Sequence, residues 1–351
     1  SGPAQAVRGH GAGALPLPVA AAFLRAIGGV AAREIAAHPP SRLLLGRRAR
    51  QVARQGAGDW RVLLDDGSTL HTRRVLFAMG GRQELAEALG RELLPGLRLV
   101  DGFAARCMLT GELFAEGGVL RLRRRLAGIA APRAVIVGGS HSAVTAAQVL
   151  LASAGLPWGP GAITLLHRRA PRLFYPDRDA ARADGYLQFG RDDVCPRTGR
   201  VFRLAGLRMA ARELLRQAWG LGGAAPEPRL CLAELPAMAP AALRALLAGA
   251  DVIVPAFGYR PNTVQVVDEQ GRRIALRAEA GPREPLVDAQ CRVLAADGSA
   301  LPDLFGIGLA SGFVPRDAQL GGEASFDGQT NGLWLYQNGV GRRVLDQLRG
   351  G

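Results

Sequence analysis

The sequence predicts an α/β fold, and three observations carry that prediction. Residues 133–169 contain two short apolar runs that flank a glycine-rich turn and an Ala-, Val- and Leu-rich segment. The order strand, turn, helix, strand is that of a βαβ unit in a parallel sheet. Within residues 17–77, apolar residues first recur at helical spacing and then occur in short strand-like runs. The length of 351 residues, with 48% apolar content, allows two globular domains.

The turn of the βαβ unit consists of Gly138, Gly139, Ser140, His141, Ser142 and Ala143. Gly138 lets the chain turn sharply out of the strand, and Ala143 keeps the helix close to the sheet. The free N–H groups at the start of such a helix can receive a pyrophosphate. Ser140 replaces the middle glycine of the G-x-G-x-x-G pattern, but the flanking strand and helix favour dinucleotide binding over a plain loop.

The second strand of the unit ends in His167, Arg168 and Arg169. Enzymes that select NAD carry an acid about 20 residues past the glycines, where it bonds the ribose 2′-hydroxyl. Two arginines in its place suit a 2′-phosphate, so the sequence predicts NADPH rather than NADH. The alternative is that both arginines are simply solvated in an arginine-rich chain.

The charge of the chain is strongly positive, at +14 with a pI near 11.1. The sequence contains no lysine, and its arginines are spread along the whole length. Only residues 121–126 approach a basic patch, with few aromatic residues nearby, and a solvated helix face or a domain junction explains them. We therefore expect no nucleic-acid partner, because such proteins gather their cations on one surface.

The apolar runs are all shorter than the roughly 18 residues of a membrane span. The first apolar segment, near residues 16–24, lacks the basic start of a signal peptide. These observations predict a cytoplasmic protein without a membrane partner. A homo-oligomer is compatible with the sequence.

Four cysteines, Cys107, Cys195, Cys231 and Cys291, lie far apart without a C-x-x-C pair. This spacing argues against a disulfide framework, a metal site and a redox-active dithiol. The histidines form no catalytic triad with a nucleophile motif. Redox chemistry would have to come from a bound cofactor.

The N-terminal part predicts a loop over residues 1–15 and a helix over Leu17–Ala37 that His38-Pro39-Pro40 ends. Three strand-like runs follow, at residues 42–45, 60–64 and 74–78. Asp66-Gly67 predicts a hairpin turn after the second run.

Three further stretches occur in a characteristic order. They are residues 78–83, with Gly80, Gly81 and Gln83; residues 251–262, with Gly258 and Tyr259; and residues 304–310, with Gly306 and Gly308. In this order they resemble the flavin-dependent N-hydroxylating monooxygenases and the pyridine nucleotide-disulfide oxidoreductases, which have two dinucleotide-binding domains. The similarity covers most of the chain.

The resemblance implies a partial FAD-binding Rossmann-like domain, residues 1–123 and 297–351, with an inserted NADPH-binding Rossmann-like domain, residues 124–296. It implies an NADPH-dependent flavin oxidoreductase, a monooxygenase of the N-hydroxylating type that acts on a small molecule, with FAD and NADPH as cofactors and no side chain acting as a nucleophile. A helix expected over residues 330–348 would aim Thr330 and Asn331 at the flavin.

Two departures leave alternatives open. The first FAD motif of the family is absent, and Leu309 replaces the acid that often follows the late glycine turn. The chain is either a piece of a longer flavoenzyme or a relative that has lost ordinary FAD binding. In the second case it would be a partner subunit or a non-redox catalyst.

Residues 174–219 form an insertion that a dinucleotide fold does not need. It carries tyrosines and aspartates, including Tyr175, Asp184, Tyr186 and the adjacent pair Asp192-Asp193. Long polar insertions in compact domains are often functional lids. A surface excursion without function is the alternative.

Overall fold

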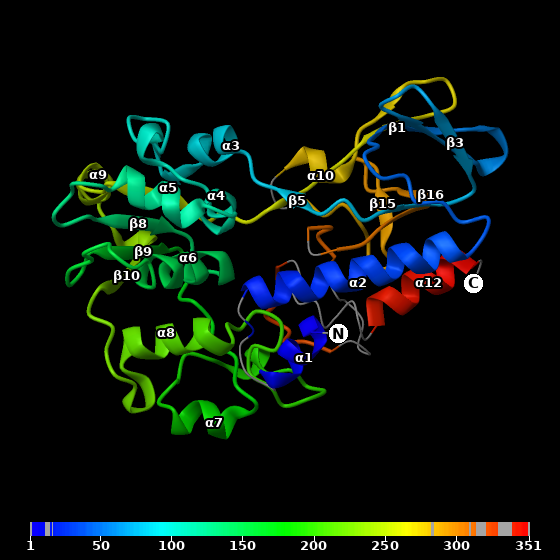
Figure 1. Ribbon diagram of the computed structural model, residues 1–351. Coiled ribbons are helices and arrows are strands. Elements are labelled where there is room, and N and C mark those ends of the chain that lie inside the picture. The colour runs from blue at the N-terminus through cyan, green and yellow to red at the C-terminus, as the bar shows by residue number, and fades with distance from the viewer. Residues whose placement is uncertain are drawn as a thin grey trace. The chain divides into compact units, whose positions relative to one another are not determined.

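The computed structural model describes residues 2–10, 15, 17–281, 284–308, 310–313, 321–328 and 339–349. The chain divides into two compact units, and Figure 1 shows their elements. The first unit comprises Ser1–Thr72 and Val264–Arg273, and the second Arg73–Thr263 and Ile274–Gly351. Within the described ranges, no helix is long and apolar enough to cross a bilayer.

The described residues of the first unit form α-helices, a short 3-10 helix at Gly56–Gly58 and a five-stranded sheet. The α-helices are α1 (Gly2–Gly9) and α2 (Leu17–Ala37). The sheet has the order β14 (Arg273–Ile274), β13 (Gln265–Val267), β1 (Ala49–Arg54), β2 (Trp60–Leu64) and β3 (Thr69–Thr72). β1 is parallel to β13 and antiparallel to β2, which is antiparallel to β3. The buried residues Val52 and Trp60 form its core.

The structure confirms the helix over Leu17–Ala37 and the hairpin at Asp66-Gly67. Gly67 has a φ of +84°, which glycine adopts without strain, and the Asp66 carboxylate accepts a 3.0 Å hydrogen bond from the N–H of Ser68. Two expectations were wrong. Residues 2–9 form helix α1 instead of a loop, and residues 42–45 form no strand, because the sheet pairing begins only at Ala49.

The second unit is built on a four-stranded parallel sheet. Its order is β10 (Leu230–Glu234), β9 (Ile163–His167), β8 (Ala134–Val137) and β11 (Val252–Pro255). Every residue of β8 and β11 is buried, as expected for strands covered on both faces. This is the sheet that the βαβ pattern predicts, so the α/β fold class is confirmed.

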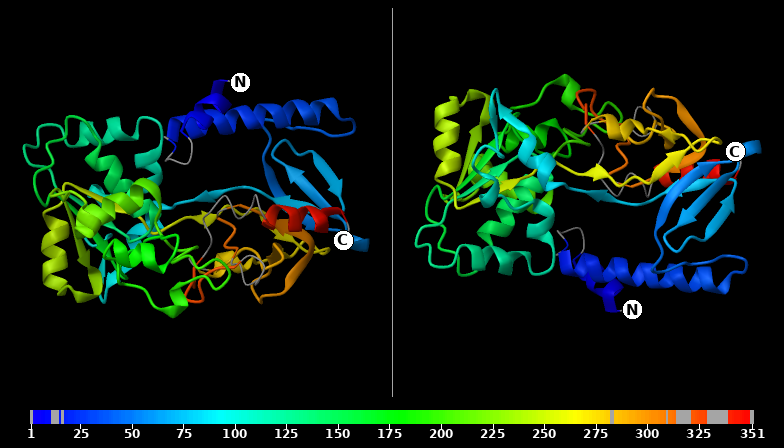
Figure 2. Two further views of the ribbon diagram at one scale, coloured as in Figure 1. Left: turned by 90° about the horizontal axis from the view of Figure 1, so that it is seen from below. Right: turned by 90° about the horizontal axis from the view of Figure 1, so that it is seen from above.

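Helices cover both faces of this sheet (Figures 1 and 2). Alternate residues of β8 point to opposite sides: Ala134 and Ile136 pack with α6 (His141–Leu151) and α8 (Met209–Trp219), and Val135 and Val137 pack with α9 (Pro240–Ala248). This alternation follows from the two-residue period of a strand. Both apolar faces of the sheet are therefore buried.

A second, three-stranded sheet joins strands that come before and after the strands of the parallel sheet in the sequence. Its order is β15 (Arg292–Leu294), β16 (Ala300–Gly306) and β4 (Val75–Phe77), and β16 runs parallel to β4. Nearby, β5 (Gly81–Arg82) pairs with β12 (Arg260–Pro261). The strand expected at residues 74–78 is thus confirmed, and it lies beside the late strand of the resembled family. The domain boundaries 1–123, 124–296 and 297–351 stay a prediction.

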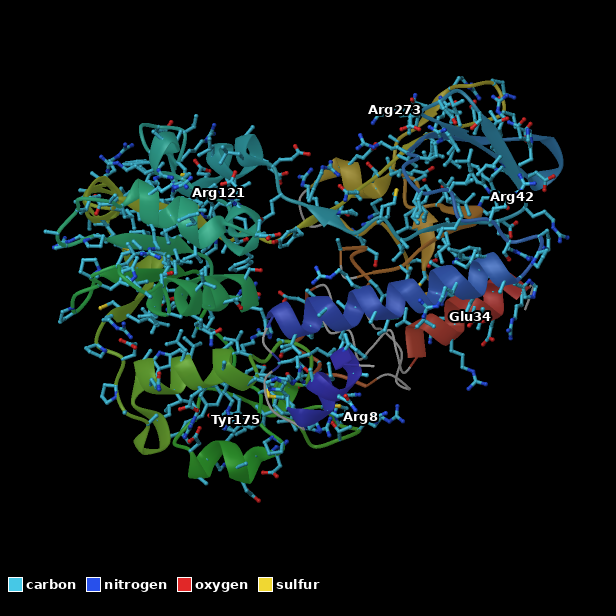
Figure 3. All side chains as sticks on the ribbon, in the orientation of Figure 1. Arg8, Glu34, Arg42, Arg121, Tyr175 and Arg273 are labelled. Carbon is cyan, nitrogen blue, oxygen red and sulfur yellow. The ribbon has the colours of Figure 1, made fainter. Side chains whose placement is uncertain are left out.

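The remaining elements of this unit are short. They are α3 (Leu85–Gly90), β6 (Glu92–Leu94), β7 (Leu97–Arg98), α4 (Thr110–Phe114), α5 (Gly118–Arg125), α7 (Arg178–Ala183), α10 (Arg277–Ala280) and α12 (Gly341–Arg349). In α5 the side chain of Leu122 is buried and the arginines, Arg121 among them, are exposed (Figure 3). The basic patch is therefore a solvated helix face. α12 covers the later part of the helix expected over residues 330–348.

The insertion at residues 174–219 is folded into this unit. Tyr175, Tyr186 and Phe202 are buried and belong to the same apolar cluster as β8 and α6. The ring of Tyr186 stacks on Tyr175 and on Trp219, with ring centroids 5.3 and 6.3 Å apart. The insertion is thus a packed part of the domain, and its role as a lid stays a prediction.

Candidate dinucleotide site

The glycine turn after β8 lies where the backbone approaches two neighbouring strand ends. Gly138 has a φ of +150°, and a Cβ atom there would lie 2.6 Å from the carbonyl oxygen of Ala256. A Cβ atom on Gly139 would lie 2.9 Å from the Cβ of His167. Both distances are shorter than real Cβ contacts, so both positions require glycine. The turn leaves the sheet between β8 and β11, where the strand order reverses, which is the usual ligand position in such sheets.

The first turn of α6 presents free N–H groups to this place. Ser140 precedes the helix, and its carbonyl oxygen accepts hydrogen bonds from the N–H groups of Ala143 and Val144. The N–H groups of His141 and Ser142 have no partner among the described residues. Ala143 is fully buried, as expected where the helix packs most closely on the sheet. Such a helix start favours an anion, because the helix dipole is positive there.

A cavity of about 740 Å³ opens at this turn. It is lined by residues of the turn, of the segment after β9, of the segment after β11, of the insertion, and of the late segment: Gly138, Gly139, Ser140, His141, Ser142, Arg168, Arg169, Arg172, Leu204, Ala205, Ala256, Phe257, Gly258, Tyr259, Gly312, Phe326, Asp327 and Gly328 among others. A volume of this size suits a nucleotide cofactor. The structure therefore brings together most of the residues predicted for the NADPH site.

The two predicted phosphate-binding arginines differ in their surroundings. The Nη1 atom of Arg169 lies 2.9 Å from a carboxylate oxygen of Asp327, and the Arg169 guanidinium lowers the pKa of Asp327. Arg168 is exposed and has no ion-pair partner in the part of the chain that the structure describes. Arg168 is therefore the arginine that is available to a phosphate group.

Both histidines of the predicted site have a lowered pKa, which disfavours their charged forms. Burial lowers the pKa of His141, and the charge of Arg208 adds to this effect. Burial also lowers the pKa of His167, whose buried Nδ1 atom has no hydrogen-bond partner among the described residues. His141 lines the cavity, whereas His167 lies behind the turn, against Gly139. His141 is the one of the two that can reach a bound nucleotide.

Gln83 lies at a smaller cavity of about 280 Å³, which Gly258 and Tyr259 also line. Its side-chain amide donates hydrogen bonds to the hydroxyl of Thr110 at 2.8 Å and to the carbonyl oxygen of Gly258 at 3.2 Å. Its amide oxygen accepts a 2.8 Å hydrogen bond from the N–H of Gly111. Gln83 therefore fixes the segment after β11 to the first turn of α4.

The remaining predicted residues occupy tight or open backbone positions. A Cβ atom on Gly81 would lie 2.6 Å from the Cβ of Ala310, and one on Gly306 would lie 2.7 Å from Val287. Gly80 and Gly308 have φ angles of +67° and +117° with open space around them. Close packing thus explains Gly81 and Gly306. Leu309, Thr330 and Asn331 lie outside the described residues.

The described residues fit the two implied cofactors to different degrees. One strand, glycine turn and helix unit with a free arginine fits a dinucleotide that carries a 2′-phosphate. A second unit of this kind, which would hold the pyrophosphate of FAD, does not occur in the described ranges, although Gly80 and Gly308 offer open backbone. Sequence reasoning missed Arg172, Phe326 and Asp327, because no local pattern links residues 326–328 to a turn at residue 138.

No family model matches the chain. The chain is 36% identical over 348 residues to a CMP-5′-(3-aminopropyl)phosphonate hydroxylase from Streptomyces rubellomurinus, covering 95% of this chain and 76% of that protein.

Solved structures are similar at lower identity. An L-lysine 6-monooxygenase from Pseudomonas syringae shares 13% identity at a TM-score of 0.43, over 86% of this chain and 70% of that chain. A flavin-containing monooxygenase from Stenotrophomonas maltophilia shares 16% identity at a TM-score of 0.42, over 87% and 72% of the two chains. An ornithine N-hydroxylase from Kutzneria sp. 744 shares 14% identity at a TM-score of 0.41, over 86% and 71%.

Proposed function

This chain belongs to the family of the CMP-5′-(3-aminopropyl)phosphonate hydroxylase of Streptomyces rubellomurinus, and from that premise we propose that it is an NADPH-dependent flavin monooxygenase that hydroxylates the amino group of a small molecule. Membership in a hydroxylase family confirms the expected class of enzyme, an oxidoreductase of the monooxygenase type. The substrate class we propose is an amine carried on a nucleotide-linked phosphonate, like the one named for the relative.

The observation that carries the proposal is the cavity at the glycine turn. The free N–H groups of His141 and Ser142 lie on the positive end of the α6 dipole, and Arg168 is exposed at the end of β9. These groups suit the pyrophosphate and the 2′-phosphate of NADPH. The nicotinamide nucleotide is therefore the cofactor that the described residues support most directly.

The chemistry itself belongs to the cofactors, which when bound supply hydride transfer and oxygen activation. The chain contributes binding and position. The α6 N–H groups hold the pyrophosphate, and Arg168 holds the 2′-phosphate. Phe257 and Phe326 contribute apolar surface to the cavity lining. His141 can donate or accept one hydrogen bond beside the phosphates, and burial lowers its pKa and so disfavours its charged form.

A titration with NADPH and NADH tests the nucleotide site. Each charge-assisted contact contributes about 1.5 to 3 kcal/mol, so replacing Arg168 and Arg169 by Ala should weaken NADPH binding roughly tenfold or more and leave NADH nearly unchanged. Arg182→Ala, an exposed arginine of α7 away from the cavity, is the matched control. Equal losses for the two nucleotides in the double variant would show that these arginines do not bind the 2′-phosphate.

A second experiment tests the reaction. The protein, supplied with FAD, NADPH and oxygen, is incubated with aminoalkylphosphonates with and without a linked nucleotide, and the products are analysed by mass spectrometry. We expect a product heavier by one oxygen atom. Flavin uptake without such a product from any of these amines would refute the proposed substrate class, and a protein that takes up no FAD would favour the redox-inactive alternative.

A further inference from the structure

We infer that Asp327 sets the cofactor selectivity of this site by supplying, from a distant segment, the acid that the end of β9 lacks. This inference rests on the proposed NADPH site. In enzymes that use NAD, an acid at the end of the second strand accepts a hydrogen bond from the ribose 2′-hydroxyl. Here that strand ends in His167, Arg168 and Arg169, and Asp327 lies against Arg169.

The contact places a carboxylate within the nucleotide cavity. Asp327, Arg168, Arg169 and Arg172 all line the cavity, and Asp327 is the one carboxylate among its described lining residues. The ion pair between Arg169 and Asp327 measures 2.9 Å, and the side chains are 67% and 64% exposed. Both groups are therefore within reach of a ligand. Because Asp327 forms an ion pair with Arg169, Arg168 is left to bind a phosphate.

The segment that carries Asp327 is anchored to the insertion. Glu323 is only 4% exposed, and its carboxylate accepts hydrogen bonds of 2.9 and 2.8 Å from the N–H groups of Leu204 and Ala205. The N–H of Ser325 donates a 2.9 Å hydrogen bond to the carbonyl oxygen of Asp192. These contacts hold residues 323–325 at the wall of the cavity. A buried anchor thus holds the chain two residues before Asp327.

A carboxylate in this position acts oppositely on the two nucleotides. It repels a 2′-phosphate dianion and competes with it for Arg169, because like charges at close range are unfavourable. The same carboxylate can accept a hydrogen bond from the 2′-hydroxyl of NADH. Asp327 therefore reduces the ratio of NADPH affinity to NADH affinity that the two arginines create.

The test is the Asp327→Asn variant, which keeps the shape of the side chain and removes its charge. Binding of NADP⁺, NAD⁺ and adenosine 2′,5′-bisphosphate is measured by isothermal titration calorimetry. Loss of a repelling charge should tighten binding of NADP⁺ and of the bisphosphate by about three- to tenfold and weaken or leave unchanged that of NAD⁺. Asp179→Asn, another exposed ion-paired aspartate outside the cavity, should change none of these affinities.

A second variant tests whether Asp327 acts on nucleotide binding through Arg169. In a chain with Arg169→Ala, the additional change Asp327→Asn should give a smaller gain for NADP⁺, because the freed arginine is absent. A parent protein that binds neither NADP⁺ nor the bisphosphate would refute the proposed nucleotide site itself. A parent that binds NADP⁺ while Asp327→Asn leaves the ratio of NADP⁺ to NAD⁺ affinity unchanged would refute only the role of Asp327.

Discussion

The phenol hydroxyl of Tyr175 donates a 2.6 Å hydrogen bond to the carboxylate of Asp184. Asp184 also accepts two hydrogen bonds from the guanidinium of Arg216, one of them 2.7 Å long from Nε. Arg212 lies over the ring of Tyr175, 4.2 Å from its centroid. Tyr175 itself is fully buried, beside α7 and α8 (Figure 3). This network joins the end of α7 to α8 and so holds two parts of the insertion together.

Tyr175→Phe should lower the free energy of unfolding by about 1.5 to 3 kcal/mol, because a hydrogen bond to a charged group is lost in a buried place. Asp184→Asn should cost more, since Arg212 and Arg216 then lose their shared counter-charge. Urea unfolding measures both changes. Tyr259→Phe, at a tyrosine that is 40% exposed, is the control. A Tyr175→Phe variant as stable as the parent would contradict the structural role of this hydroxyl.

Ala143→Leu should reduce stability and nucleotide binding together. Ala143 is fully buried where α6 packs on the sheet, and overpacking typically costs about 1 to 3 kcal/mol. The helix start would shift away from the glycine turn. Thermal unfolding and NADPH titration check the two effects, with Ala152→Leu at the exposed end of α6 as control. An unchanged melting temperature with parental NADPH affinity would show that this turn does not receive the cofactor.

Glu323→Gln should destabilise the protein by about 1.5 to 3 kcal/mol, because one of the two charged acceptors for the N–H groups of Leu204 and Ala205 becomes a donor. It should also weaken the effect of Asp327 on nucleotide selectivity, since the anchor of its segment is lost. Urea unfolding and the NADP⁺ to NAD⁺ affinity ratio are the measurements. Glu116→Gln changes an exposed glutamate and serves as control. No loss of stability would mean that the anchor is dispensable.

Stability should fall as the pH drops below about 6.5, the value at which unfolded histidines titrate. Burial lowers the pKa of His141 and of His167 in the folded chain. Between the lowered and the unfolded pKa the unfolded state binds more protons, so acid favours unfolding. Urea unfolding at about pH 7.5 and about pH 5.5 measures the change. His141→Gln should show a smaller difference in stability between the two pH values than the parent. His71→Gln, at an exposed histidine, is the control and should show the same difference as the parent. Identical pH dependence in all three proteins would exclude His141 as a contributor.

The sequence predicted those parts of the fold whose signals are local. β8, the glycine turn, α6 and β9 follow one another within residues 134–167, and each is marked by its own apolar run or by glycine. Helix α2 and the hairpin at Asp66-Gly67 are likewise set by period and turn chemistry. The prediction of a strand at residues 42–45 was wrong because strand formation also depends on non-local pairing. An apolar run forms a strand only where a partner strand is available, and here the pairing with β2 and β13 begins at Ala49.

By itself the sequence determined the α/β class, the glycine turn between β8 and α6 and the arginines at the end of β9, because each depends on neighbours a few residues apart. Only the tertiary structure decided how the two arginines differ. Asp327 lies 158 residues from Arg169 in the chain, yet the buried carboxylate of Glu323 fixes its segment beside the cavity. Such a contact depends on the packing of the insertion against the late segment. No periodicity or spacing in the sequence encodes that packing.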